Sequence, residues 1–177
     1  MNPKDSTSLY LVGPMGAGKS TLGRHLAQVL GRPFYDSDRV IEEKTGADIP
    51  WIFDMEGEEG FRRRERDVID ELTARPGIVL ATGGGVVTGE ENRRHLHERG
   101  CVVYLWTPVE VQLARTRNDR NRPLLQTRDP QTRLEALFRE RDPLYREVAH
   151  GVVSTASGNL KKVIDQVLGC LAGHASR

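Results

Sequence analysis

Short runs of apolar residues, each ended by turn-forming residues, recur along the chain. They occupy residues 9–13, 33–36, 78–81, 102–106 and 151–154. The longer stretches between them carry apolar residues at helical spacing, for example Leu22, Leu26 and Val29. Continuous apolar strands that alternate with helices are typical of a parallel sheet covered on both faces. The pattern therefore predicts an α/β fold, and the length predicts a single domain over residues 1–177.

Two segments interrupt this alternation. Residues 37–65 are helical in character but contain three glycines and a proline, while residues 117–130 are polar, rich in arginine and interrupted by Pro123. Open α/β sheets bind their ligands beyond the carboxyl ends of the strands. We therefore expect both segments to be insertions that stand over this edge of the sheet.

The composition excludes several classes of protein. Hydrophobic residues make up 37% of the chain, and no apolar run reaches the ~18 residues that a membrane-spanning helix needs. Residues 1–8 are polar, so no signal peptide is expected, and Cys101 and Cys170 are expected to be reduced thiols of a cytoplasmic protein. A formal net charge of +1 argues against a protein that coats nucleic acid.

The basic residues are mostly arginine. Five of the 26 are lysine, which leaves 21 arginines, and nine of these fall between Arg115 and Arg146. The planar guanidinium group suits phosphates and carboxylates. A solvated charged surface would have the same composition, so composition alone does not choose between the two.

Residues 13–21 carry the most specific local motif. Their sequence, Gly-Pro-Met-Gly-Ala-Gly-Lys-Ser-Thr, satisfies the pattern G-x-x-x-x-G-K-[ST] and lies between a predicted strand and a predicted helix. The glycines let backbone N–H groups point at an anion, and the helix start adds its positive dipole end. Lys19 can reach the terminal phosphates, and the Ser20 hydroxyl can bind Mg²⁺. The motif predicts a nucleoside triphosphate site formed by Gly16, Ala17, Gly18, Lys19, Ser20 and Thr21.

Two carboxylates follow the second predicted strand. Asp36 and Asp38 are two residues apart, so they point to one side of extended backbone, at the edge that carries the phosphate loop. One could hold Mg²⁺, and the other could accept a proton from a substrate hydroxyl. Alternatively, Ser37 or Asp38 could cap the helix that follows. The nearby phosphate loop favours the functional interpretation.

A run of glycines and two arginines could hold an acidic substrate. Gly83, Gly84 and Gly85 exceed what a simple turn needs, which indicates backbone that lies close to a ligand. Arg62 lies where a helix is expected to begin, and Arg141 lies where another is expected to stop before a proline. For each arginine taken by itself, a charged residue on the surface is the favoured interpretation.

In their order along the chain these motifs resemble those of the shikimate kinase family. The resemblance spans residues 9–155 and rests, besides the phosphate loop, on residues 36–38, 45–46, 57–62, 82–85, 122–125 and 141–145. It implies a three-layer P-loop kinase fold with a five-stranded parallel sheet, helices on both faces, a small substrate lobe at about residues 37–65 and a lid at about residues 117–130. The implied reaction is ATP-dependent phosphorylation of the 3-hydroxyl of shikimate, which gives shikimate 3-phosphate and ADP in the chorismate route to aromatic amino acids.

The resemblance also implies the residues that bind and convert the substrate. Asp38 would bind the shikimate hydroxyls and act as the base, and Lys19 and Arg122 would complete the catalytic set. The remaining substrate contacts would come from Arg62, Gly83, Gly84, Gly85 and Arg141.

ATP and a metal ion would be held by a second set of residues. Arg115 would pack on the adenine, and Arg122 would reach from the lid to the transferred phosphoryl group. Ser20 and Asp36 would organise Mg²⁺. The partners implied are shikimate and ATP, without nucleic acid or membrane, and the chain is expected to be a monomer.

Two other functions remain open from the residues alone. One is phosphorylation of a different small acceptor, such as gluconate or a nucleoside monophosphate. The other is a nucleotide-binding protein without catalysis, which would be expected to lack part of the catalytic set; Lys19, Asp38 and Arg122 are all present.

Overall fold

A five-stranded parallel sheet forms the centre of the computed structural model, which describes residues 6–119 and 122–177. The strand order is β2-β3-β1-β4-β5, and every neighbouring pair is parallel. The strands are β1 (Ser8–Val12), β2 (Phe34–Asp36), β3 (Val79–Ala81), β4 (Gly100–Trp106) and β5 (Gly151–Ser154). The fold class predicted from the apolar runs is confirmed.

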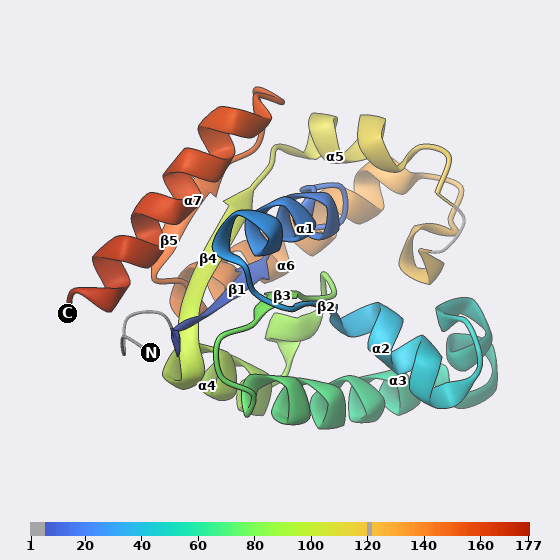
Figure 1. Cartoon of the computed structure of the whole chain (residues 1–177). Coiled ribbons are helices and arrows are strands. Elements are labelled where there is room, and N and C mark those ends of the chain that lie inside the picture. Colours follow the sequence, from blue (N-terminus) through green and yellow to red (C-terminus); the bar gives the residue numbers. More distant parts are fainter. Residues whose placement is uncertain (1–5, 120–121) are drawn as a thin grey trace.

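Helices connect the strands and cover both faces of the sheet (Figure 1). They are α1 (Lys19–Leu30), α2 (Ser37–Thr45), α3 (Ile49–Thr73), α4 (Glu90–Arg99), α5 (Val109–Thr116), α6 (Pro130–Val148) and α7 (Leu160–Ala175), with short 3₁₀ turns η2 (Val86–Thr88) and η3 (Pro123–Leu125). Helices α1 and α7 pack on one face, and α3, α4 and α6 pack on the other. Among the described residues, no helix is long and apolar enough to cross a membrane.

Each strand supplies side chains to both cores because successive residues point to opposite faces of a sheet. In β1, Tyr10 belongs to the core under α3, α4 and α6, whereas Leu9 and Leu11 belong to the core under α1 and α7. All five residues of β1 are buried. The phosphate loop that follows β1 therefore starts from the rigid centre of the molecule.

The helices depart from the sequence prediction at their glycines and prolines. Gly57 (φ 72°) bends α3, but Gly60 lies inside the helix and does not break it, and Arg62 lies well within α3 rather than near its start. Pro143 lies inside α6, so the expectation that the helix stops there is wrong. Burial of Tyr145 and Val148, both beyond the proline, offsets the backbone hydrogen bond that proline removes.

The two insertions stand beyond the carboxyl ends of the strands. The expected substrate lobe corresponds to α2 and the first half of α3, which pack on each other. The expected lid runs from the end of α5 through η3 to the start of α6. Its residues 120 and 121 lie outside the described residues.

Candidate active site

The phosphate loop curls around the start of α1 at the carboxyl end of β1. Gly18 caps the helix with φ 90°, a left-handed conformation that side chains other than glycine rarely adopt. A cavity of about 380 Å³ lies against this loop, and we call it the phosphate cavity. Its lining includes Gly16, Gly18, Lys19, Ser20 and Thr21, together with Asp36, Asp38 and Arg122. Ala17 is the exception in the predicted set, because its side chain packs in the core.

Lys19 is buried at the base of the phosphate cavity. Its ammonium group donates to the backbone oxygens of Gly13 (2.7 Å) and Pro14 (2.8 Å). Burial, followed by the positive charge of Arg122, lowers the pKa of Lys19 to about 7. A bound phosphate would stabilise the charged form of this buried lysine, because the anion supplies a counter-charge.

Asp36 has three hydrogen-bond partners, two on one carboxylate oxygen and one on the other. Oδ1 accepts from the backbone N–H groups of Asp38 (3.0 Å) and Arg39 (3.3 Å) and so caps α2, while Oδ2 accepts from the Ser20 hydroxyl at 2.5 Å. The helix cap is therefore Asp36 and neither of the alternatives, Ser37 and Asp38. The Ser37 hydroxyl instead accepts from the N–H of Gly83 at 3.1 Å.

Asp38 is left free of capping and points into the site. Its Oδ1 is buried without a hydrogen-bond partner in the described part of the chain. Burial, followed by the neighbouring charge of Asp36, raises the pKa of Asp38 to about 6, against the opposing effect of Arg122, Lys19 and Arg62. An unpartnered carboxylate of this kind can accept a hydrogen bond and a proton from a ligand.

A second, smaller cavity of about 60 Å³ adjoins the first, and we call it the arginine cavity. Its lining includes Arg62, Arg122, Arg141, Asp38, Glu65, Gly83, Gly84 and Gly85, with Met15, Phe53 and Phe61 as apolar walls. Asp38, Gly84 and Arg122 line both cavities. The two cavities thus share one wall, which carries the candidate base and the candidate lid arginine.

Arg62 and Arg141, two arginines of this cavity, differ in their partners. Arg62 donates to Glu65 at 3.0 Å and to the exposed Glu58 at 3.4 Å. Arg141 is buried in α6, and its Nε has no hydrogen-bond partner within the described residues. Tyr145, one turn further along α6, donates its hydroxyl to the Gly84 oxygen. A buried guanidinium group with an unused donor is suited to an anionic ligand.

The glycine run lets these charged side chains approach the backbone. A Cβ at Gly83 would lie 2.6 Å from Asp38 Oδ1, and one at Gly85 would lie 2.5 Å from an Arg62 nitrogen. Both separations are shorter than side chains tolerate. The glycines line the cavity as predicted, and the structure adds a second reason for them, which is access for Asp38 and Arg62.

Glu65 is a site residue that the sequence analysis did not identify. It is fully buried, and its Oε2 has no hydrogen-bond partner among the described atoms. Burial raises the pKa of Glu65 to about 7, although Arg62 opposes the shift. The available signal was its spacing from Arg62, because residues three apart share a helix face.

The two arginines predicted to contact the nucleotide, Arg115 and Arg122, lie in different places relative to the cavities. Arg115 lines neither cavity and ties the phosphate loop to the segment after β5, donating to the oxygens of Gly16 (2.9 Å) and Thr155 (2.8 Å). Arg122 pairs with Asp119 at 3.0 Å at the mouth of the phosphate cavity. Arg122 thus lines the phosphate cavity, and its contact with the transferred phosphoryl group, like that of Arg115 with adenine, stays a prediction.

A phosphate loop at the helix start, a buried lysine and an adjoining cavity lined with arginine and carboxylate groups define a small P-loop kinase. A model of the family described as shikimate kinase matches residues 15–172. The chain therefore belongs to the shikimate kinase family, as the order of its motifs indicated.

Known proteins agree with this assignment along nearly the whole chain. Shikimate kinase from Halorhodospira halophila is 61% identical over 168 residues, which cover 95% of each chain. The structure is also similar to that of shikimate kinase from Acinetobacter baumannii in complex with shikimate, with a TM-score of 0.93 and 56% identity over 97% of this chain and 96% of that one. A gluconokinase from Sinorhizobium meliloti shares the fold alone, with a TM-score of 0.59 and 16% identity over 97% and 95% of the two chains.

Proposed function

We propose that this chain transfers the γ-phosphoryl group of ATP to the 3-hydroxyl of shikimate and releases shikimate 3-phosphate and ADP. The observation that carries the proposal is the wall of Asp38, Gly84 and Arg122 common to the phosphate and arginine cavities. Donor and acceptor bound in adjoining cavities can meet at such a wall in line with the transfer.

The arginine cavity supports a hydroxylated carboxylic acid as the acceptor. Arg141 has an unused buried donor, and Arg62 is fixed by Glu65, so both can offer charge-assisted hydrogen bonds to one carboxylate. The apolar wall of Phe53 and Phe61 suits the carbon ring. Asp38 then lies on the side of the phosphate cavity, where the reacting hydroxyl has to be.

Asp38 is proposed as the base because its environment leaves it able to take a proton. A pKa of about 6 keeps the Asp38 carboxylate mostly ionised at neutral pH. This pKa is also closer to neutral pH than that of an ordinary carboxylate, which makes Asp38 a better base. It accepts the hydroxyl proton as the acceptor oxygen attacks the γ-phosphorus, and the bond to the β–γ bridging oxygen breaks.

Positive groups on the donor side stabilise the charge of the transferred group. The negative charge of this group spreads over its equatorial oxygens, so positioned cations supply most of the catalysis. Lys19 approaches from the phosphate loop, and Arg122 approaches from the lid. Closure of the lid over both cavities would exclude water, which would otherwise compete as the acceptor.

Ser20 and Asp36 fit the Mg²⁺ that ATP chemistry requires. Their oxygens lie 2.5 Å apart at the wall of the phosphate cavity, and Mg²⁺ prefers oxygen ligands. When bound, the ion neutralises phosphate charge. Asp36 keeps its other oxygen on the N-terminus of α2, which fixes the carboxylate in place.

The experiment that tests the proposal is ADP release with each of three acceptors. Shikimate with Mg-ATP should give rapid release and a product in which phosphorus is coupled to the proton on carbon 3 by NMR. Gluconate and a nucleoside monophosphate should give only the slow release seen without acceptor. The Lys19→Ala variant, checked by circular dichroism, supplies the background rate. Faster release with gluconate or the nucleotide than with shikimate would contradict the proposal.

We also propose that the enzyme works as a monomer. All the residues assigned to the reaction lie in this one chain, so the reaction requires no side chain from a second copy. Light scattering during size-exclusion chromatography should give the mass of a single chain, 19.8 kDa. Activity that falls more steeply than in proportion on dilution would contradict this.

A further inference from the structure

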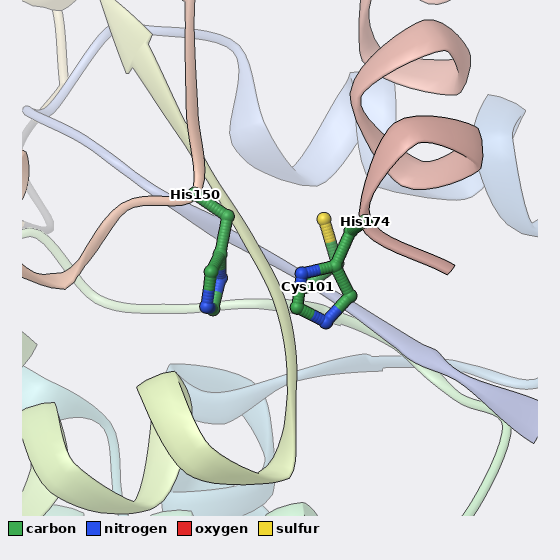
Figure 2. Close-up of side chains that lie close together, drawn as sticks. All are labelled: Cys101, His150 and His174. Atoms are coloured by element: carbon green, nitrogen blue, oxygen red, sulfur yellow. The ribbon is translucent and has the colours of Figure 1, made fainter. Parts of the chain in front are cut away.

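Cys101, His150 and His174 lie close together on the part of the molecule between β4, β5 and α7 (Figure 2). One ligand atom from each residue, a sulfur and two ring nitrogens, lies within 4.8 Å of the other two. Cys101 is the second residue of β4, His150 directly precedes β5, and His174 lies in the last turn of α7. Three segments far apart in sequence thus bring their metal-binding atoms to one point.

This cluster is separate from the phosphoryl-transfer site. Cys101 is paired with Leu9 near the start of β1, whereas the phosphate loop follows the other end of that strand. All strands are parallel, so the cluster lies toward the amino ends of the strands and the two cavities lie at the carboxyl ends. Along β1, the rise from Leu9 to Val12 is about 10 Å, and the phosphate loop begins only after Val12. None of the three cluster residues lines either cavity.

We propose that Cys101, His150 and His174 bind a zinc ion, with solvent completing its coordination. One thiolate with two imidazoles is a ligand set that suits Zn²⁺, and zinc sites with three protein ligands keep a fourth position open. The exposed edge of His150 gives an ion access to the buried sulfur. The site goes beyond phosphoryl transfer, which uses none of these side chains.

The surroundings favour the neutral form of both imidazoles. Burial, followed by the charges of neighbouring groups, lowers the pKa of His150 to about 4 and also lowers the pKa of His174. Neutral imidazole is the form that binds metals. Burial raises the pKa of Cys101 to about 11, so the ion must displace the thiol proton, and binding should tighten as pH rises.

Two features work against binding and set its character. Nδ1 of His150 accepts from the backbone N–H of Val102 at 3.0 Å, so the ring must turn out of this bond to offer a lone pair to the ion. The positive Arg177 also lies close enough to lower the pKa of both histidines. We therefore infer an exchangeable zinc ion that ties α7 to the sheet, rather than a permanent structural ion.

The test uses Co²⁺ as a spectroscopic probe of the full chain. Cobalt bound to a thiolate gives an intense near-ultraviolet charge-transfer absorption, which reports the Cys101 ligand directly. The absorption should appear on titration with Co²⁺, disappear when Zn²⁺ is added, and be absent in Cys101→Ser. In His174→Ala the affinity for Co²⁺ should fall at least about tenfold. His174→Ala guards against misfolding of the buried cysteine variant, because it lies at the end of the last helix.

Cys170→Ser is the matched control. This second thiol lies one turn before His174 and packs against Gly151, but it is outside the three-residue cluster. It should keep the absorption and the affinity of the parent. Zn²⁺ should also raise the Tm of the parent and of Cys170→Ser but not of His174→Ala. No thiolate absorption, or its loss in Cys170→Ser with retention in Cys101→Ser, would overturn the proposal.

Discussion

Asp38 and Glu65 approach the same backbone carbon, the Cα of Gly83. A Cβ built there would lie 2.6 Å from Asp38 Oδ1 and 3.2 Å from Glu65 Oε2. Two carboxylates placed so closely titrate as a pair. Burial is the main cause that raises both pKa values, to about 6 for Asp38 and about 7 for Glu65, and the charge of Asp38 adds to the rise at Glu65. The pair therefore takes up its protons at a higher pH than exposed carboxylates do.

The turnover of shikimate should fall in acid as Asp38 gains a proton. Because its folded pKa is about 6, kcat/KM for shikimate at saturating Mg-ATP should decline about tenfold per pH unit below about pH 6. The Glu65→Gln variant should keep this acid limb, since burial and the charge of Asp36 raise the pKa of Asp38. Carbon NMR of the Asp38 carboxyl group provides an independent measurement. A flat profile down to about pH 5 in the folded enzyme would contradict the assignment.

Glu65→Gln should stabilise the fold at alkaline pH. The folded pKa of Glu65, about 7, exceeds its ordinary value of 4.5, so the folded state loses stability as pH rises from about 4.5 to about 7. Glutamine removes this loss and keeps an acceptor for Arg62. The gain in unfolding free energy should reach at most about 3 kcal/mol at pH 8 and vanish near pH 4. Urea unfolding at both pH values measures it. The exposed Glu59→Gln, on the same helix, should show no such dependence.

Gly83→Ala should remove activity without removing nucleotide binding. The new Cβ has to displace Asp38, so kcat should fall by at least the ~10²-fold expected for a lost base. ATP affinity should stay within a few-fold, because the phosphate loop belongs to another segment. Gly169→Ala is the matched control, since nothing lies within 4 Å of its Cβ position. Comparable kcat in both variants would show that Asp38 does not need this approach.

Arg141→Ala should weaken the binding of shikimate far more than the binding of ATP. Loss of a charge-assisted hydrogen bond in an enclosed site costs about 1.5–3 kcal/mol, or roughly ten- to a hundredfold in affinity. Isothermal titration with each ligand separates the two effects. Arg139→Ala, an exposed residue of the same helix, should change neither. Equal losses for both ligands would indicate general damage rather than a lost substrate contact.

Asp36→Asn and Asp38→Asn should differ in their response to magnesium. Asparagine at residue 36 can still cap α2 but cannot offer a charge to the ion, so excess Mg²⁺ should recover part of the lost rate. At residue 38 the same change removes the base, and added Mg²⁺ should recover nothing. Rate measured against Mg²⁺ concentration decides between the roles. Rescue of Asp38→Asn instead would reverse them.

The phosphate loop and the sheet could be predicted because their information is local. Every residue of β1 and β3 is buried, so each strand reads as an uninterrupted apolar run. The loop from Gly13 to Thr21 is contiguous, and its spacing is tied directly to its chemistry. Both predictions needed no knowledge of how distant segments pack.

The misplaced features depend on contacts between distant segments. Glu65 lies in a strongly charged stretch, where the sequence resembles an exposed helix face, yet it is fully buried and lies close to Gly83, which is distant in the sequence. Pro143 stops no helix, because the residues after it are fixed by burial in the core. At such positions tertiary packing overrides the local propensity of the residues, and this packing cannot be read from a single sequence.

The tie from Arg115 to both Gly16 and Thr155 has a consequence for synthesis on the ribosome. The phosphate loop is made within the first 21 residues, but its anchor through Arg115 needs a segment made after β5. A nascent chain that ends before residue 155 therefore carries the complete nucleotide motif and Arg115 but lacks the Thr155 oxygen that joins this arginine to the end of the sheet. We therefore expect ATP to stabilise the complete chain more than a chain cut short before residue 155.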